Sequence, residues 1–226
     1  MSLFVDDRVR LLAQQTFANL VNPVKLVFFT QKDVCLACSE QEKLLRELTS
    51  MSTKIRLQVF DFVLNGDEVM NYKVDKIPAT VVAGDHDFGI RFYGLTVGYE
   101  FKPLIDDMVL VSAERSELDP RLELLVKSLA VRVHLQVMVS LTCPHCPSMV
   151  RVAHQFAVAN HNIRADMVDL TQFPYLAQRY NVTGTPKTLI NENYSFVGSL
   201  PATATYLEIL KAVDPEKYRQ VTAGTN

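Results

Sequence analysis

Several features that would point to particular classes of protein are scarce in this sequence. It has only four cysteines in 226 residues, which is too few for a scaffold held together by disulfides at this length. No uninterrupted apolar stretch approaches the roughly 20 residues that a membrane-spanning helix needs. The N-terminal stretch MSLFVDDRVRLLAQQTF has no basic segment followed by an apolar run, so we expect no signal peptide. Together these absences predict a cytoplasmic protein.

Charge of one sign is not in excess either. The formal net charge is −2 and no cluster of lysine and arginine stands out, so we expect neither a nucleic-acid nor a membrane partner. The composition, with 48% apolar and 21% charged residues, is that of an ordinary globular protein. The length suits one large domain or two domains of about 100 residues each.

The four cysteines that are present form two CxxC pairs. Cys35 and Cys38 lie in VCLACS, and Cys143 and Cys146 lie in TCPHCP. In a reducing compartment such pairs are typical of redox catalysts or metal sites. A zinc site with four thiolates is one alternative, although a full domain length separates the pairs and compact zinc modules use shorter spacers. A structural disulfide at the first pair, with catalysis confined to the second, is another alternative.

The two pairs belong to an internal repeat. When the chain is shifted by 108 residues, both cysteines of the first pair align with those of the second, and other identities follow: Ile55 with Ile163, Asp61 with Asp169, Tyr72 with Tyr180, Val74 with Val182, Pro78 with Pro186 and Thr80 with Thr188. This repetition predicts two diverged copies of one unit. We expect them to span residues 1–115 and 116–226, with the boundary in the polar run AERSELDP.

The hydrophobic periodicity has the same order in both halves. For the first half it predicts helices at 6–20, 39–50, 66–73 and 99–112, and strands at 24–29, 55–62, 79–83 and 90–94. For the second half it predicts helices at 120–129, 148–160, 175–180 and 203–213, and strands at 131–139, 163–170, 187–191 and 194–198. The predicted fold class is α/β, with a central mixed β-sheet flanked by helices in each unit.

Each CxxC pair follows a strand and precedes a helix. The first backbone N–H groups of a helix lack partners within it and its dipole is positive there, so a thiolate is stabilised and the thiol pKa falls. We therefore expect Cys35 and Cys143 to be nucleophiles, and Cys38 and Cys146, one helical turn on, to be the resolving thiols. His145 can stabilise the Cys143 thiolate, which predicts a lower pKa and a more oxidising potential at the second pair.

Each half resembles a thioredoxin or glutaredoxin. The resemblance rests on the order strand, CxxC and helix, and on a proline 43 residues beyond the first cysteine of each pair. In that family this proline is cis and faces the cysteines, which would place the role on Pro78 and Pro186. The resemblance also implies that the backbone of the preceding residues, Ile77 and Thr185, is presented to an incoming extended peptide.

The tandem arrangement resembles the glutaredoxin-like protein disulfide oxidoreductases of thermophiles. The segments NPVKL, KIPAT, DFGIRFYGL and CPHCPSMVRVAHQFA carry this resemblance. It implies dithiol–disulfide exchange on protein or peptide substrates by the cysteine pairs themselves, with no metal or other cofactor, and a flavin-dependent thioredoxin reductase as reductant. One departure is that Phe29 and Val137 occupy the positions where thioredoxins carry a buried aspartate.

Other functions remain open at this point. The N-terminal domain of the alkyl hydroperoxide reductase flavoprotein has a similar architecture but keeps one CxxC, so an electron-transfer module for a peroxidase is one alternative. A non-catalytic tandem thioredoxin fold that binds peptides or zinc is another. Active thiol–disulfide exchange that survives a chelator would separate the enzyme from the binding protein.

Overall fold

The computed structural model describes residues 7–223 of the chain. The outer ends of the two predicted units, 1–6 and 224–226, lie outside the described residues, as does Asp6, where we expected the first helix to begin. The first described helix, α1, spans Asp7–Phe17. None of the helices in 7–223 is long and apolar enough to cross a membrane.

The two halves contain the same series of elements. The first half continues with β1 (Val24–Thr30), α2 (Leu36–Thr49), β2 (Ile55–Asp61), α3 (Gly66–Asn71), β3 (Ala79–Ala83), β4 (Asp87–Tyr93), the 3-10 helix η1 (Gly98–Glu100) and α4 (Phe101–Ala113). The second half contains α5 (Pro120–Lys127), β5 (Val133–Val139), α6 (Cys146–Ala159), β6 (Ile163–Asp169), α7 (Pro174–Arg179), β7 (Lys187–Ile190), β8 (Tyr194–Val197), α8 (Ala202–Val213) and α9 (Pro215–Ala223). Strands β2 and β6, and helices α3 and α7, begin and end 108 residues apart, so the repeat in sequence is a repeat in structure.

The strands form one continuous mixed sheet of eight, in the order β2-β1-β3-β4-β6-β5-β7-β8. The predicted α/β class is therefore confirmed, and each half contributes four strands in the same order. The sequence did not predict that the two halves would share one sheet. They are joined by parallel pairing of β4 with β6, from Ile90 opposite Ala165 to Tyr93 opposite Val168. This pairing is long-range, and neither strand alone signals its partner.

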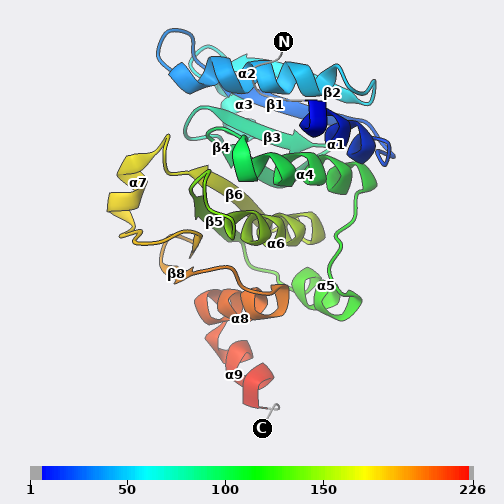
Figure 1. The fold of residues 1–226 in the computed structure, drawn as a ribbon. Coiled ribbons are helices and arrows are strands. Elements are labelled where there is room, and N and C mark those ends of the chain that lie inside the picture. The colour runs from blue at the N-terminus through cyan, green and yellow to red at the C-terminus, as the bar shows by residue number, and fades with distance from the viewer. Residues whose placement is uncertain (1–6, 224–226) are drawn as a thin grey trace.

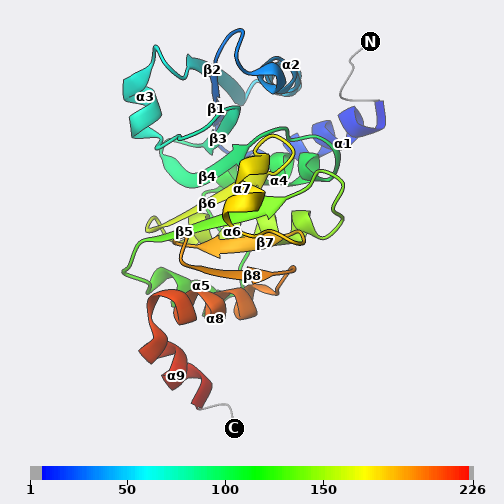
Figure 2. The same ribbon diagram turned by 90° about the vertical axis from the view of Figure 1, so that its left-hand side faces the viewer.

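Helices cover both faces of this sheet. Helices α2, α4 and α6 lie on one face, and α3 lies on the other, as the two perpendicular views show (Figures 1 and 2). Alternate residues of each strand enter two separate cores because side chains alternate across a strand. Leu26 and Leu135 belong to the core under α4 and α6, and Phe29 and Met138 belong to the core under α7 and the α3 loop.

The sheet brings both cysteine pairs to the same edge. Strands β1 and β5, which precede the pairs, point in the same direction, because β1 is antiparallel to β3, β3 is antiparallel to β4, and β4, β6 and β5 are parallel. Four strand steps separate β1 from β5, which is about 19 Å at roughly 4.8 Å per step. The two pairs are thus too far apart to exchange a disulfide directly within this arrangement.

The helix starts differ in one respect from the prediction. Cys35 is the N-cap of α2, in extended backbone, as predicted. Helix α6 begins only at Cys146, so Cys143 lies in the turn before it. We expected Pro144 to stand in the first helical turn, but Pro147 does, where a missing N–H costs nothing. Helix α9, a short amphipathic extension after Pro215, was not predicted.

Candidate active site

The second cysteine pair lies against the loop that leads into β7. The Sγ of Cys143 lies 3.4 Å from the carbonyl oxygen of Thr185 and donates to it. The peptide bond between Thr185 and Pro186 is cis, as the resemblance implied, and β7 begins at the next residue. Because β7 pairs with β5, the loop and the cysteine turn are fixed at the same edge of the sheet. Three of the residues predicted for this site therefore come together.

The two thiols of this pair have opposite electrostatic surroundings. Burial raises the pKa of Cys143, but hydrogen bonds with the Cys146 thiol, with Thr185 and with the backbone amides of His145 and Cys146 outweigh it, so the pKa is lowered overall. Burial and the neighbouring Cys143 raise the pKa of Cys146 to about 12. The arrangement makes Cys143 the thiol that ionises first and keeps Cys146 protonated until its partner changes.

His145 contributes to this site through its backbone. Its amide N–H reaches the Cys143 sulfur, while its side chain is exposed to solvent. Among the hydrogen bonds of the described residues, none joins the imidazole to the sulfur. A role for the His145 ring in tuning the thiolate stays a prediction.

The first cysteine pair forms a disulfide, with its Cα atoms 5.3 Å apart. Cys38 is buried, with 2% of its surface exposed, whereas Cys35 is partly exposed. Cys35 lines a cavity of about 410 Å³ together with Ile77 and Pro78, whose peptide bond is cis. Gln172 of the second half completes this lining. The residues predicted for the first site therefore also converge.

The surfaces around the two pairs differ in polarity. Beside Cys35, Leu36 is 92% exposed and Val34 is 70% exposed, and both line the cavity. Beside Cys143 the exposed side chains are hydroxyls, with the Ser148 Oγ 2.6 Å from the Ser199 Oγ. Two large apolar side chains in solvent are typical of a surface that another molecule covers.

Sequence reasoning missed a buried carboxyl next to the second pair. Glu100 is fully buried at the end of η1, and neither of its carboxylate oxygens has a hydrogen-bond partner among the described residues. Helix η1 packs on the segment before Cys143, where the Tyr99 amide donates to the Leu141 carbonyl over 3.5 Å. Burial, with smaller contributions from Asp169 and Asp107, raises the pKa of Glu100 to about 8. The only signal in the sequence was a glutamate beside an apolar helix.

Replacement of Glu100 by glutamine should change how stability depends on pH. Because the pKa of Glu100 is raised in the folded state, the folded protein binds the extra proton between about pH 4.5 and 8, and stability falls as pH rises through that window. The loss is about 1.4 kcal/mol for each unit by which the pKa is raised. Thermal unfolding of Glu100→Gln should match the wild type near the lower limit and exceed it above the upper one. Parallel melting curves at both pH values would contradict the assignment.

The four cysteines do not converge on one site. Each pair lies in its own half, four strands apart, and among residues 7–223 there is no group of three or more His, Cys, Asp or Glu side chains suited to hold a metal ion. A zinc site with four thiolates needs all four sulfurs within bonding distance of one ion. This geometry does not fit that alternative.

Comparisons with known proteins agree with this architecture. A family model described as a thioredoxin domain matches residues 133–211. A protein disulfide oxidoreductase from Aeropyrum pernix K1 is 26% identical, with 95% of this chain and 96% of that chain covered and a TM-score of 0.86. The N-terminal domain of the alkylhydroperoxide reductase AhpF from Enterococcus faecalis is 26% identical, with 93% and 100% covered and a TM-score of 0.85.

Curated relatives are longer than this chain. The AhpF protein of alkyl hydroperoxide reductase from Pseudomonas aeruginosa is 30% identical over 105 residues, which are 46% of this chain and 20% of that protein. The chain spans between 20% and 27% of the length of the first such relatives. With its repeated cysteine pairs, cis-prolines and shared sheet, the chain is a tandem thioredoxin-fold protein with the architecture of a thiol–disulfide oxidoreductase.

Proposed function

We propose that this protein is a dithiol–disulfide oxidoreductase that acts on protein or peptide substrates. The observation that carries the proposal is the contrast within the second pair, where the pKa of Cys143 is lowered and that of Cys146 is raised to about 12. Thiol–disulfide exchange needs one sulfur ionised and accessible and a second held in reserve. The same pairs argue for a reducing compartment, and cytoplasmic location is part of the proposal.

The reaction at the second pair has two steps. The Cys143 thiolate attacks one sulfur of a substrate disulfide, so a mixed disulfide forms and a substrate thiolate leaves. Cys146 then loses its proton and attacks the Cys143 sulfur, which closes the Cys143–Cys146 disulfide and releases the second substrate thiolate. The substrate gains two electrons and the pair loses two, and the reverse sequence oxidises a substrate dithiol. In this scheme Thr185 and Pro186 position the substrate backbone.

The first pair acts in the same way on a more apolar substrate segment. Cys35 would accept attack or attack in turn, Cys38 would resolve, and Ile77 and Pro78 would border the bound chain. The partly exposed Cys35 in a cavity, beside exposed Val34 and Leu36, supports this role over a purely structural disulfide. Since about 19 Å separates β1 from β5, electrons would pass between the pairs through a substrate or another molecule.

Reduction of insulin by dithiothreitol tests the proposal. We expect the protein to accelerate precipitation of the insulin B chain over the reductant alone, and the acceleration to be unchanged in excess EDTA. A rate equal to that of the reductant alone would contradict catalysis. A rate that EDTA abolishes would instead indicate a metal-dependent protein.

Alkylation should distinguish the two thiols of the second pair. With a pKa of about 12, Cys146 is thiolate in roughly one molecule in ten thousand at about pH 8, whereas the lowered pKa of Cys143 gives a far larger fraction. Because only thiolates react, iodoacetamide should label Cys143 first. Peptide mass spectrometry after a short pulse checks this. Since Cys146 lowers the pKa of Cys143, Cys146→Ala should slow labelling of Cys143 at neutral pH, and equal labelling of both thiols in the wild type would argue against the assigned roles.

Electron transfer to a peroxidase is the second candidate. The likeness to the N-terminal domain of AhpF favours it, because that match covers 93% of this chain. In this role a flavin-dependent reductase would reduce the cysteine pairs, which would pass the electrons to a peroxiredoxin. NADH oxidation in a mixture of the protein, a thioredoxin reductase, a peroxiredoxin and peroxide would then depend on the protein. Insulin turnover without such coupling favours the first candidate.

A further inference from the structure

A basic cavity lies at the edge of the sheet opposite to the cysteines. It has a volume of about 350 Å³ and opens where β5 and β6 begin. The described residues that line it include no aspartate or glutamate, and five of them carry or can acquire positive charge: Lys73, Arg132, His134, His161 and Arg164. These residues come from three separate segments, so no basic cluster is visible in the sequence.

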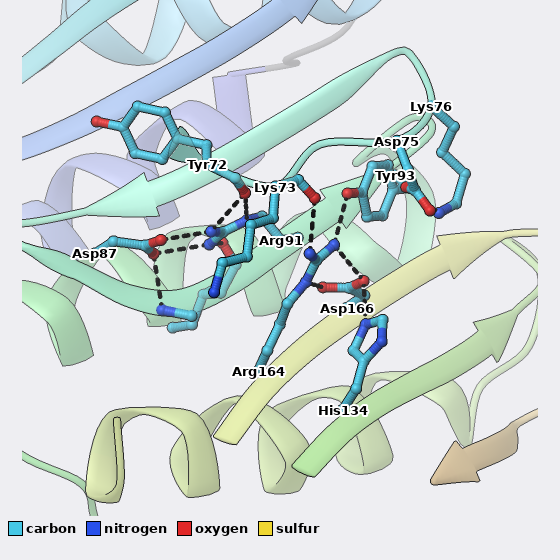
Figure 3. A network of polar contacts seen from close by, with 12 residues as sticks. Tyr72, Lys73, Asp75, Lys76, Asp87, Arg91, Tyr93, His134, Arg164 and Asp166 are labelled. Atoms are coloured by element: carbon cyan, nitrogen blue, oxygen red, sulfur yellow. Dashed lines mark hydrogen bonds and ion pairs between the residues drawn. The ribbon is translucent and has the colours of Figure 1, made fainter. Parts of the chain in front are cut away.

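Two of the cationic groups are held rigidly by a buried carboxylate. The Arg164 guanidinium donates to Asp166, to the hydroxyl of Tyr93 and to the Lys73 carbonyl, at 2.7–2.8 Å. The His134 Nε2 lies 2.6 Å from the Oδ2 of the same Asp166 carboxylate. Figure 3 shows Asp166 between the two side chains. Because Asp166 is fully buried, it fixes both groups without itself lining the cavity.

The remaining positive charge of the cavity is not neutralised. Within residues 7–223, neither Lys73 nor Arg132 forms an ion pair. The chain that carries Arg132 is braced, because the Asn191 side-chain amide donates to the Arg132 carbonyl at 3.2 Å and accepts the His134 amide at 2.7 Å. Two like charges that converge on one cavity repel each other, and an anion between them would remove that repulsion.

The backbone of Lys73 supplies an independent indication. Lys73 follows α3 in the left-handed conformation, with φ of 52°, and its counterpart after α7 is Asn181, with φ of 48°. Asparagine adopts this conformation readily, whereas lysine is less suited to it. A lysine that stands where the local conformation favours asparagine indicates that its side chain has a use.

We propose that this cavity binds a phosphate group carried by a small molecule. Arginine and lysine side chains on a preorganised frame suit a phosphate. The volume of 350 Å³ lies at the lower end of the range of about 300–1,000 Å³ typical of small-molecule sites, which leaves room for a phosphate and a little more. Five steps along β5, from His134 to Val139, place the cavity about 17 Å from the cysteine edge. The site is therefore separate from the proposed redox chemistry.

Isothermal titration of the full chain tests this site. The probes are pyrophosphate and ADP, with adenosine as the uncharged comparison, all at a constant ionic strength of about 0.15 M. The double variant Lys73→Asn with Arg132→Gln removes both unpaired charges and keeps the residue type that stands at 181. Arg56→Ala is the matched control, because Arg56 is an exposed arginine on β2 that occupies the repeat position of Arg164 but does not line the cavity.

We expect saturable binding of a phosphate probe with a dissociation constant below the millimolar range. The double variant should bind about tenfold more weakly or worse, and Arg56→Ala should bind like the wild type. Equal affinity for pyrophosphate and ADP would identify the bare anion as the ligand, whereas tighter ADP with no adenosine binding would identify a nucleotide phosphate. Absence of saturable binding of both probes, or equal binding in the double variant, would overturn the proposal.

A second measurement does not depend on the variants. Addition of pyrophosphate to the wild type should shift the NMR signals of the His134 and His161 rings, which line the cavity, and leave that of His86 unchanged. Thermal unfolding of the double variant shows whether it has folded before its affinity is interpreted. If the histidine signals stay fixed while the variant is unfolded, the site is rejected on the first result alone.

Discussion

Cys143→Ser should reduce thiol–disulfide exchange at the second pair to the rate of the reductant alone. The measurement is insulin reduction in a chain whose first pair has been removed by Cys35→Ser and Cys38→Ser, so that only the second pair can act. A serine hydroxyl stays protonated where the backbone amides of His145 and Cys146 lower the pKa of the thiol, so no nucleophile is available. This is the largest effect that we expect on activity.

Cys146→Ser is the matched comparison for this experiment. It leaves the nucleophile in place but removes the resolving thiol, so a mixed disulfide with the substrate should accumulate and be visible by mass spectrometry. Cys143→Ser should accumulate none. If Cys143→Ser retains the activity of its parent, or if Cys146 rather than Cys143 captures the substrate, then the proposed order of attack is wrong.

Asp166→Ala should destabilise the fold by about 3–5 kcal/mol, the cost of leaving buried cations without their partner. Asp166 is fully buried at the centre of the sheet, where it accepts from Arg164 at 2.8 Å and pairs with His134 at 2.6 Å. Burial alone would raise the pKa of Asp166, but His134 and Arg164 outweigh it and hold the pKa well below its usual range. Urea unfolding at neutral pH measures the loss.

The pH dependence of this effect has a definite sign. Because the pKa of Asp166 is lowered in the folded state, its contribution is fully present above the unfolded pKa of about 3.9 and is lost as pH falls below it. The difference between wild type and Asp166→Ala should therefore shrink in acid. Glu123→Ala is the control, since Glu123 pairs with the exposed Lys127 and should cost less than about 1 kcal/mol. A cost for Asp166→Ala no larger than the control would show that the buried carboxylate does not stabilise the fold.

Much of the architecture could be predicted from the sequence because it depends on local pattern. The alternation of apolar residues indicated β1 and β5, the helical periodicity indicated α2 and α4, and the repeat at 108 residues indicated two like units. The resemblance placed cis-prolines at Pro78 and Pro186, and both are cis. The convergence of Cys143 with Thr185 follows from the same fold, because β7 pairs with β5.

Three features could not be read from the sequence, for a common reason. The joining of the halves through β4 and β6, the buried position of Glu100 beside the second pair, and the basic cavity around Lys73 and Arg132 each bring together residues far apart in the chain. By itself the sequence determined the units and their reactive sulfurs, because periodicity and spacing are properties of neighbouring residues. Only the tertiary structure decided which charges are buried and which meet, because burial and electrostatic pairing depend on distances in space that a chain acquires when its strands find their partners.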